Sequence, residues 1–540
     1  MPKALRLSAT QLSALEIDPA NLHHPFQIIP KRVTPGKGVK VVASQTEGAG
    51  HGMIVLEGVK PGELIFEIEE PMFTIIQDGK YTSMNTCDYC FAAKEEESGF
   101  HNVISEGLKF MVCSGCKVVH YCSKECQINA WKQYHKHECR CLITLQEMGM
   151  HQSDDANPVY QATYRSLVRL LKMDQHDKIS NAQRIEISAC YWNQKLWQED
   201  SDAYLEARHI AKQVSDITGT SHPEDEVLTL LLKLAANEIK MTFHLLRPLG
   251  RSYKCNSPYV VKAGRCFDPF ASMINHSCDP NALWHFEGRK LRLVASQILS
   301  PGEEICVSYI KYTNYNVRQQ ELQRGWGFIC NCDVCLVGKY GINSEPVFNR
   351  VIHPLPMAPQ ELSFTRAALD SEDIDAVEME MAIFHLMIHL ANRRIRHALG
   401  GNRKEALRSC VRQYTLAHEM KPKIDESEFL DILYHMVHLI HDQDFEIGCD
   451  AISFLSLHLL HEKMLHAKAA FGADSSLYRF ETMEYHKLTM TWGKRTGKKW
   501  IDLCEKKPLK AKFDKNLDLL QRWAGDLSGC VPERKIKERK

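Results

Sequence analysis

Eight residues between positions 87 and 139 constrain the fold of this chain more than any other feature. They form four pairs at metal-ligand spacings: Cys87 and Cys90, Cys113 and Cys116, Cys122 and Cys126, His135 and Cys139. Cysteine and histidine pairs of this kind are typical of tetrahedral zinc sites, and eight ligands predict two sites. Because so short a segment buries little apolar surface, metal binding would supply most of its folding free energy.

The order of the four pairs leaves two ligand arrangements open. If neighbouring pairs share a metal, the segment forms two independent knuckles. If the pairs interleave, one zinc is held by Cys87, Cys90, Cys122 and Cys126, and the other by Cys113, Cys116, His135 and Cys139. We prefer the interleaved arrangement because it locks the segment into one unit. His137 and Cys141 repeat the last spacing two residues later, but the gap from Cys126 favours His135 and Cys139.

Length, charge and cysteine usage narrow the class of protein. A chain of 540 residues exceeds what one hydrophobic core usually supports, so we expect two to four domains. The 67 basic and 67 acidic residues balance, which makes nucleic acid unlikely as the primary ligand. The cysteines cluster at the spacings of metal ligands, and residues 1–22 contain no continuous apolar segment. We therefore expect a reducing compartment, nuclear or cytoplasmic, and no membrane association.

A second informative stretch lies downstream, from residue 275 to residue 335. It begins with Asn-His-Ser-Cys-Asp-Pro-Asn at 275–281, followed by a strand-like run at 291–294. A Pro-Gly-Glu-Glu turn at 301–304 leads into a further expected strand, 305–310, which ends on Tyr309 and Ile310. Just beyond, Cys330, Cys332 and Cys335 offer three thiolates, one short of a closed structural zinc site.

The segment at 87–139 resembles a MYND zinc finger. It carries the Tyr-Cys-Ser-Lys-x-Cys core of that family at 121–126 and the Ala130-Trp131 pair that precedes the histidine. The interleaved metal assignment also matches the family. The 22 residues between Cys90 and Cys113 exceed the usual MYND spacing, so we expect an exposed insertion there.

The downstream stretch looks like a SET domain, and with the finger the chain resembles the SET and MYND domain-containing protein-lysine methyltransferases. Residues 275–278 match the pseudoknot motif, and Gly50-His51-Gly52 resembles the cofactor-contacting Gly-x-Gly, although asparagine often stands where this chain has His51. The resemblance covers about residues 30–335. It implies S-adenosylmethionine as the cofactor and a protein lysine as the substrate, on histones, non-histone proteins or both.

The resemblance also implies roles for individual residues. Tyr309 would be the catalytic residue, whose hydroxyl orients the amine and the methyl group, and Phe328 would pack on the adenine ring. The implied cofactor-binding residues are Gly50, His51, Gly52, Asn256, Ser272, Asn275, His276, Tyr309 and Phe328. For Asn256 the spacing departs from the family, because the stretch to Asn275 is short. Cys278 would complete the site of Cys330, Cys332 and Cys335, which gives three zinc ions in total.

We therefore predict an α+β fold: a SET β-fold interrupted by a MYND finger and a helical insertion, followed by an all-α, tetratricopeptide-like C-terminal domain. The expected boundaries are 26–86 for the first part of the SET fold, 87–139 for the finger, 140–250 for the helical insertion, 251–329 for the SET core, 330–339 for the cysteine-rich post-SET flap and 340–540 for the helical domain.

Apolar periodicity predicts particular helices. The insertion should contain helices over 160–173 and 224–246, and the C-terminal domain should begin with a stripe at Val377, Met381, Phe384, Ile388 and Ala391. His435, His438 and His441 recur every three residues, which we interpret as an exposed helix face and not as a metal site.

Three functions remain open at this stage. The first is an active protein-lysine methyltransferase. The second is a catalytically silent adaptor whose finger binds proline-rich peptides. The third, a direct nucleic-acid binder, is disfavoured by the neutral charge and the absence of an arginine-rich stripe. We expect a monomer in each case.

Overall fold

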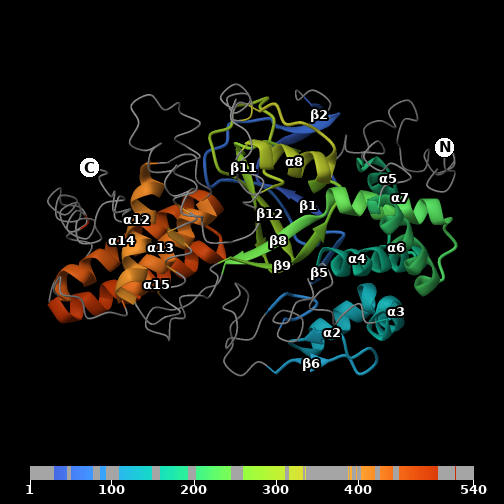
Figure 1. Ribbon diagram of the computed structural model, residues 1–540, viewed down its shortest axis with the longest axis horizontal. Helices are drawn as coiled ribbons and strands as arrows, with labels where there is room; N and C mark the ends of the chain where they lie inside the picture. The colour runs from blue at the N-terminus through green and yellow to red at the C-terminus, as the bar shows by residue number, and fades with distance from the viewer. Residues whose placement is uncertain are drawn as a thin grey trace, which may run out of the picture. The chain divides into compact units, whose positions relative to one another are not determined.

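The computed structural model describes residues 29–44, 50–76, 86–92, 109–148, 158–192, 202–244, 260–310, 315–332, 335, 387, 390–391, 394, 397, 403–419, 426–441, 449–496 and 517. These residues divide into two compact units (Figure 1). Unit 1 contains the described residues up to His244 together with Val260–Tyr309 and Glu321–Ile329. Unit 2 contains the other described residues.

The central sheet of unit 1 joins strands that are far apart in the sequence. Its order is β1 (Val33–Pro35), β4 (Leu64–Ile68), β12 (Lys290–Ala295) and β11 (Ala282–Glu287), with antiparallel neighbours throughout. Strand β4 buries Ile65, Phe66 and Ile68, and β12 buries Leu291 and Leu293 against them. Because β4 pairs directly with β12, the finger and the helices that follow it in sequence are inserted into one β-fold.

A second sheet shows that one expected helix is too long. Helix α7 (Glu224–Asn237) ends at Asn237, and residues 239–244 form strand β8 (Ile239–His244), which pairs with β9 (Val260–Phe267). Strand β5 (Phe73–Ile76) pairs with the other edge of β9. The prediction of a helix over 224–246 is therefore wrong beyond Asn237. The reason is the alternation of Ile239, Met241 and Phe243 with polar residues, which has the period of a strand.

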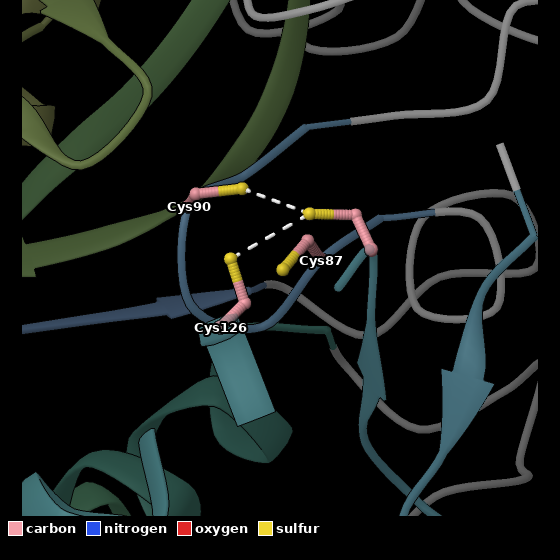
Figure 2. A group of neighbouring side chains, drawn as sticks. Cys87, Cys90 and Cys126 are labelled. Atoms are coloured by element: carbon pink, nitrogen blue, oxygen red, sulfur yellow. Dashed lines mark hydrogen bonds between the residues drawn. The ribbon is translucent and has the colours of Figure 1, made fainter. Parts of the chain in front are cut away.

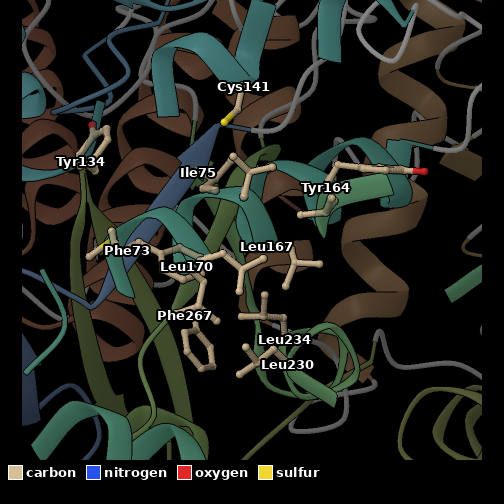
Figure 3. Close-up of a cluster of buried hydrophobic side chains, with 14 of the residues drawn as sticks. Phe73, Ile75, Tyr134, Cys141, Tyr164, Leu167, Leu170, Leu230, Leu234 and Phe267 are labelled. Carbon is tan, nitrogen blue, oxygen red and sulfur yellow. The ribbon is translucent and has the colours of Figure 1, made fainter. Parts of the chain in front are cut away.

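The finger and the helical insertion share one core. The finger contains β6 (Met111–Val112), β7 (His120–Tyr121), α2 (Lys124–Ala130), a π-helical turn (Trp131–His135) and α3 (Lys136–Glu147). The insertion contains α4 (Pro158–Gln175), α5 (Asn181–Ala189), α6 (Asp202–Thr218) and α7, of which α4, α6 and α7 lie side by side (Figure 1). Figure 3 shows side chains of both parts and of two strands in one buried cluster: Phe73, Ile75, Tyr134, Cys141, Tyr164, Leu167, Leu170, Leu230, Leu234 and Phe267.

Short elements carry the Gly-x-Gly segment and the downstream motifs. Strand β2 (Val39–Ala43) pairs with β3 (His51–Val55), and β10 (Asn275–His276) runs parallel to β13 (Cys306–Val307). A 3-10 turn (Ala271–Met273) precedes β10, and α8 (Tyr315–Trp326) follows β13. Strand β13 is shorter than the expected 305–310. The ladder stops because the N–H of Tyr309 donates to Nδ1 of His276 instead of to a strand partner.

Beyond residue 386, the described part of unit 2 is helical except for the turn at 472–475. Helices α12 (Arg403–Glu419), α13 (Glu426–His441), α14 (Cys449–Phe471) and α15 (Ser476–Thr496) each pack against the next in chain order. Of the expected apolar stripe, only Ala391 lies within the described residues. The exposed-face interpretation of the histidines is wrong, because His435 and His438 are buried against the ring of Tyr434.

Among the helices that the structure describes, none is both long and apolar enough to cross a membrane.

Candidate functional site

The first ligand cluster of the finger joins two loops that are distant in sequence. The thiols of Cys87, Cys90, Cys122 and Cys126 lie within 4.8 Å of one another, and Figure 2 shows three of these side chains pointing inward. The sulfur of Cys122 lies 3.5 Å from that of Cys90 and 3.6 Å from that of Cys126. Four sulfurs at about 2.3 Å from a tetrahedral zinc stand about 3.8 Å apart, so the cluster suits zinc.

The sequence around Cys126 explains why its thiol faces the cluster. The side chain of Ser123 caps helix α2 and accepts a hydrogen bond from the N–H of Cys126 at 3.0 Å. This cap fixes the first helical turn, so Cys122 before the helix and Cys126 within it approach the same point. The Cys-Ser-Lys-x-Cys sequence is therefore a capped helix start that carries two ligands.

The second cluster contains Cys113, Cys116, His135 and Cys139. Nε2 of His135 lies 3.2 Å from the sulfur of Cys113 and 3.7 Å from that of Cys116, and the sulfurs of Cys113 and Cys139 are 3.9 Å apart. These are the two ligand sets of the interleaved arrangement. The alternative histidine, His137, instead stacks on His176 at 3.9 Å, and the thiol of Cys141 faces the carbonyl of Ile217.

In the second cluster, the surroundings of Cys113 favour the thiolate form that binds metal. Burial opposes ionisation of Cys113, but the N–H groups of Cys116 and Gly115 and the ring of His135 lower the pKa of Cys113 to about 7. A thiol with such a pKa is readily deprotonated near neutral pH, and the resulting thiolate can bind a metal ion. Both finger clusters therefore have the donor types and the spacing that zinc requires.

Four buried charged residues connect the two finger clusters to helix α4. We call them the buried charge cluster: Asp88, Glu138, Arg165 and Arg169. Arg165 lies 2.6 Å from Asp88 and 3.4 Å from Glu138, and Arg169 lies 2.6 Å from Glu138 and 3.4 Å from Asp88. Asp88 follows the ligand Cys87, and Glu138 lies 3.5 Å from Nδ1 of the ligand His135. Both arginines thus bridge groups that stand directly behind the two metal sites.

The four cysteines that were expected to form a third zinc site belong to two different units. In unit 2, the sulfurs of Cys330, Cys332 and Cys335 lie within 4.8 Å of one another. Gln319 of α8 holds this loop through two 2.9 Å hydrogen bonds, one from its amide to the carbonyl of Cys330 and one from the N–H of Cys330. Cys278 belongs to unit 1, where its buried sulfur lies 3.3 Å from Nε2 of His276.

The Gly-x-Gly segment meets the downstream motif in unit 1. Asn275 donates from Nδ2 to the carbonyl of His51 at 2.9 Å and to Oε1 of Glu304 at 2.7 Å. Gly50 has a φ of +72°, which favours glycine, and a Cβ on Gly52 would lie 2.7 Å from Cδ of Glu304. Both glycines are therefore required by the local structure: Gly50 for its backbone angle and Gly52 for close approach.

Aromatic side chains lie close to His276, the second residue of the Asn-His-Ser-Cys motif. The ring of His276 lies 5.3 Å from that of Tyr309 and 6.0 Å from that of Phe328, and Trp326 lies 5.0 Å from Tyr309. Nδ1 of His276 accepts the N–H of Tyr309, so in the neutral ring the proton is on Nε2, which faces Cys278. The structure thus brings His276, Tyr309 and Phe328 together, as expected.

The phenol of Tyr309 is protonated at neutral pH. Burial and the nearby Cys306 and Glu304 raise the pKa of Tyr309 well above its ordinary value. Its hydroxyl donates to the carbonyl of Ile274 at 2.6 Å. Because that proton is engaged, the oxygen lone pairs are the part of the hydroxyl that can interact with another group.

Comparison with known proteins agrees with this geometry. Residues 50–310 match the family model described as the SET domain. Histone-lysine N-methyltransferase SMYD3 of Mus musculus is 24% identical over 302 residues, which cover 55% of this chain and 62% of that protein. SET domain and MYND-type zinc finger protein 6 of Schizosaccharomyces pombe is 26% identical over 287 residues, which cover 53% and 50%. This chain contains a SET domain and is similar to SET and MYND domain-containing proteins.

A further relative shows how far the likeness extends. N-lysine methyltransferase SMYD2 of Homo sapiens is 24% identical over 303 residues, which cover 53% of this chain and 58% of that protein. The chain therefore spans about half to three fifths of the curated relatives it matches. The predicted fold class is confirmed at family level: strands and a zinc-type finger form a SET fold, and the described C-terminal residues are helical.

Ser272, one of the expected cofactor residues, has other hydrogen-bond partners. Ser272 donates its hydroxyl to the carbonyls of Asp268 and Asn237, at 3.0 and 3.1 Å, so its side chain holds the turn before β10. Asn256 lies outside the described residues, as does most of the expected insertion between Cys90 and Cys113. For His51, the structure shows a role of the backbone carbonyl, which binds Asn275.

Glu304 and the buried charge cluster lie outside the motifs that the sequence displays. Glu304 was assigned only to a turn, although its position next to an expected strand was a usable signal. No local pattern marks Asp88, Glu138, Arg165 and Arg169, because their partners are 27 to 81 residues apart.

Proposed function

We propose that this chain is an S-adenosylmethionine-dependent protein-lysine N-methyltransferase, acting on histones, non-histone proteins or both. The observation that carries the proposal is the meeting of His276, Tyr309 and Phe328 in unit 1, beside the Asn275 contact with His51. Relatives with methyltransferase names and the SET domain match support it.

The residues present fit the cofactor. Asn275 and the segment Gly50–Gly52 would hold its amino-acid portion, while His276 and the Phe328 ring would pack against adenine. When bound, S-adenosylmethionine supplies an activated methyl group on a sulfonium. Three observations support the fit. The two glycines leave the backbone open to a ligand, the amide of Asn275 is fixed, and the rings of His276 and Phe328 lie close together.

Tyr309 would orient the lysine amine. Its hydroxyl proton is held by the carbonyl of Ile274, so its lone pairs can accept a hydrogen bond from the amine. Because its pKa is raised, Tyr309 is a poor general base at neutral pH, and the lysine would lose its proton to water. Lysine ordinarily has a pKa of about 10.4, so an apolar approach to the site would assist by disfavouring the charged amine.

Removal of the Tyr309 hydroxyl tests this assignment. Tyr309→Phe should abolish methyl transfer to peptide arrays and leave S-adenosylmethionine affinity within about threefold in calorimetry, because only the amine-orienting group is lost. Tyr164→Phe is the matched control: Tyr164 binds Gln213 on α6, away from the proposed site, and transfer should persist. Turnover of Tyr309→Phe within a few-fold of wild type would refute the role of Tyr309.

The alternative is a catalytically silent adaptor. Trp131 and Ile128 on the finger are 43% and 42% exposed, and exposed aromatic surface is what proline-rich peptides bind. Calorimetry separates the two functions. Zinc-loaded protein with no measurable S-adenosylmethionine affinity would leave the adaptor as the better explanation.

Three zinc ions are part of this proposal. The two finger clusters hold one each, and Cys330, Cys332 and Cys335 hold the third. Cys278 is proposed as its fourth ligand on the strength of the family resemblance. A monomer in the nucleus or cytoplasm remains our expectation for the whole protein.

A further inference from the structure

The carboxylate of Glu304 connects three segments of the proposed cofactor site. Ser44, just after β2, donates its hydroxyl to the two carboxylate oxygens at 2.9 and 3.0 Å. Asn275 of β10 donates to Oε1 at 2.7 Å. Gly52 of β3 leaves room for the carboxylate, since a Cβ there would be 2.7 Å from Cδ of Glu304 and 3.0 Å from Nδ2 of Asn275.

The backbone of Glu304 is fixed as well. Glu304 forms an antiparallel bridge with Ile54 of β3, and its carbonyl accepts a hydrogen bond from Nδ2 of Asn281 at 2.9 Å. Oδ1 of Asn281 in turn accepts the N–H of Cys306 at 2.8 Å. The carboxylate is therefore presented from a rigid position, and its residue is only 8% exposed.

This geometry determines which way the amide of Asn275 points. Both Nδ2 contacts, Oε1 of Glu304 and the carbonyl of His51, are acceptors only, so the NH2 group must face them. Oδ1 is thereby turned away. Within the described part of the chain Oδ1 receives no hydrogen bond, so it is available to accept one from a ligand ammonium.

We infer that Glu304 is a positioning residue of the cofactor site, which orients Asn275 and holds Ser44 and the Gly50–Gly52 strand around it. This inference rests on the proposed function. Loss of the carboxylate frees the amide of Asn275 to rotate and loosens the junction of three segments. Cofactor binding should suffer, whereas the Tyr309 hydroxyl keeps its own partner, the carbonyl of Ile274.

The first test compares two neighbouring carboxylates. Glu304→Ala should weaken S-adenosylmethionine binding about tenfold in calorimetry, the loss expected for a buried hydrogen bond to a charged group. The KM for the cofactor should rise in step, with kcat at saturation and the peptide KM unchanged. Glu303→Ala is the control, because Glu303 is exposed and its carboxylate only accepts the N–H of Ser300 in the turn.

A second pair of variants tests the amide orientation and serves if Glu304→Ala does not fold. Asn275→Asp places two carboxylates 2.7 Å apart and should weaken binding more than tenfold. Adding Glu304→Gln restores a donor–acceptor pair and should recover at least part of the affinity.

The outcomes separate this inference from the proposed function. Wild-type protein that binds no S-adenosylmethionine overturns the proposed function itself. Wild-type binding combined with an unaffected, folded Glu304→Ala, or with no recovery in the Asn275→Asp/Glu304→Gln protein, overturns the role of Glu304 alone.

Discussion

Replacement of Arg169 by methionine would remove one cation from the buried charge cluster and keep most of the side-chain volume. Arg169 donates to both carboxylate oxygens of Glu138, at 2.6 and 2.8 Å, and to the carbonyl of Thr74 on β5 at 2.7 Å. Its guanidinium also lies 3.7 Å from the centre of the Tyr134 ring. The variant leaves these acceptors buried without their main partner.

The charge of Glu138 sets the magnitude. Burial alone would raise the pKa of Glu138, but Arg169, His135 and Arg165 hold it well below the ordinary range, so Glu138 is a carboxylate in the folded state. Removing one partner of a buried ion pair typically costs about 3–5 kcal/mol, because a charge remains in a poorly solvating interior. We expect Arg169→Met to lose about that much, with Arg165 retaining a 3.4 Å contact to Glu138.

Urea unfolding of zinc-loaded protein, followed by tryptophan fluorescence, measures this loss. The matched control is Arg208→Met on α6, whose partner Glu224 is exposed, and it should leave the unfolding midpoint unchanged. The double variant Arg169→Met/Glu138→Gln should be less destabilised than the sum of its single variants, since it removes both buried charges together. A loss below about 1 kcal/mol in Arg169→Met, or strict additivity, would show that the cluster does not contribute as the distances indicate.

Two further predictions concern pH and metal. Hydrogen bonding to Asp174 and Glu226 raises the pKa of His222. The stabilisation by its positive charge is therefore fully present below about pH 6.5 and is lost as pH rises through the folded-state pKa. In urea titrations, the stability difference between wild type and His222→Gln should shrink across that range. Elemental analysis should find three zinc ions per chain and two after Cys330→Ser, whereas two in the wild type would remove the post-SET site.

The two finger clusters could be predicted because their information is local. Each pair of ligands lies within one turn or one capped helix start, and spacing alone fixes which side chains approach one point. The interleaved pairing followed from requiring one cooperative unit. Motif order along the chain identified Tyr309, His276 and Phe328, which the structure then brings together although 52 residues separate the first and last.

Other features depend on partners that no local pattern reveals. Residues 239–244 alternate as a strand does, but they follow a genuine helix after one extended residue, Glu238, and their partner is the separate strand β9. The helical spacing of His435 is the same on an exposed and on a buried helix face. Its burial depends on neighbouring helices and on Asp431, which lies 3.2 Å from its Nε2. Arginine and glutamate are almost never fully buried unless they are paired, and the distant pairing of Arg169 with Glu138 is not visible in the sequence.

The position of the buried charge cluster bears on whether the finger acts as a separate module. Asp88 and Glu138 come from the finger, whereas Arg165 and Arg169 come from α4, and all four are buried only because the two parts pack together. A finger without α4 would leave two carboxylates behind its metal ligands without their arginine partners, and α4 without the finger would leave two guanidinium groups without their carboxylates. Arg169 also binds the carbonyl of Thr74 on β5, so the contacts continue into the sheet. Metal binding in the finger would therefore stabilise the helical insertion and that sheet edge as well, because the expected ligand His135, Glu138, Arg169 and Thr74 form one continuous series of contacts.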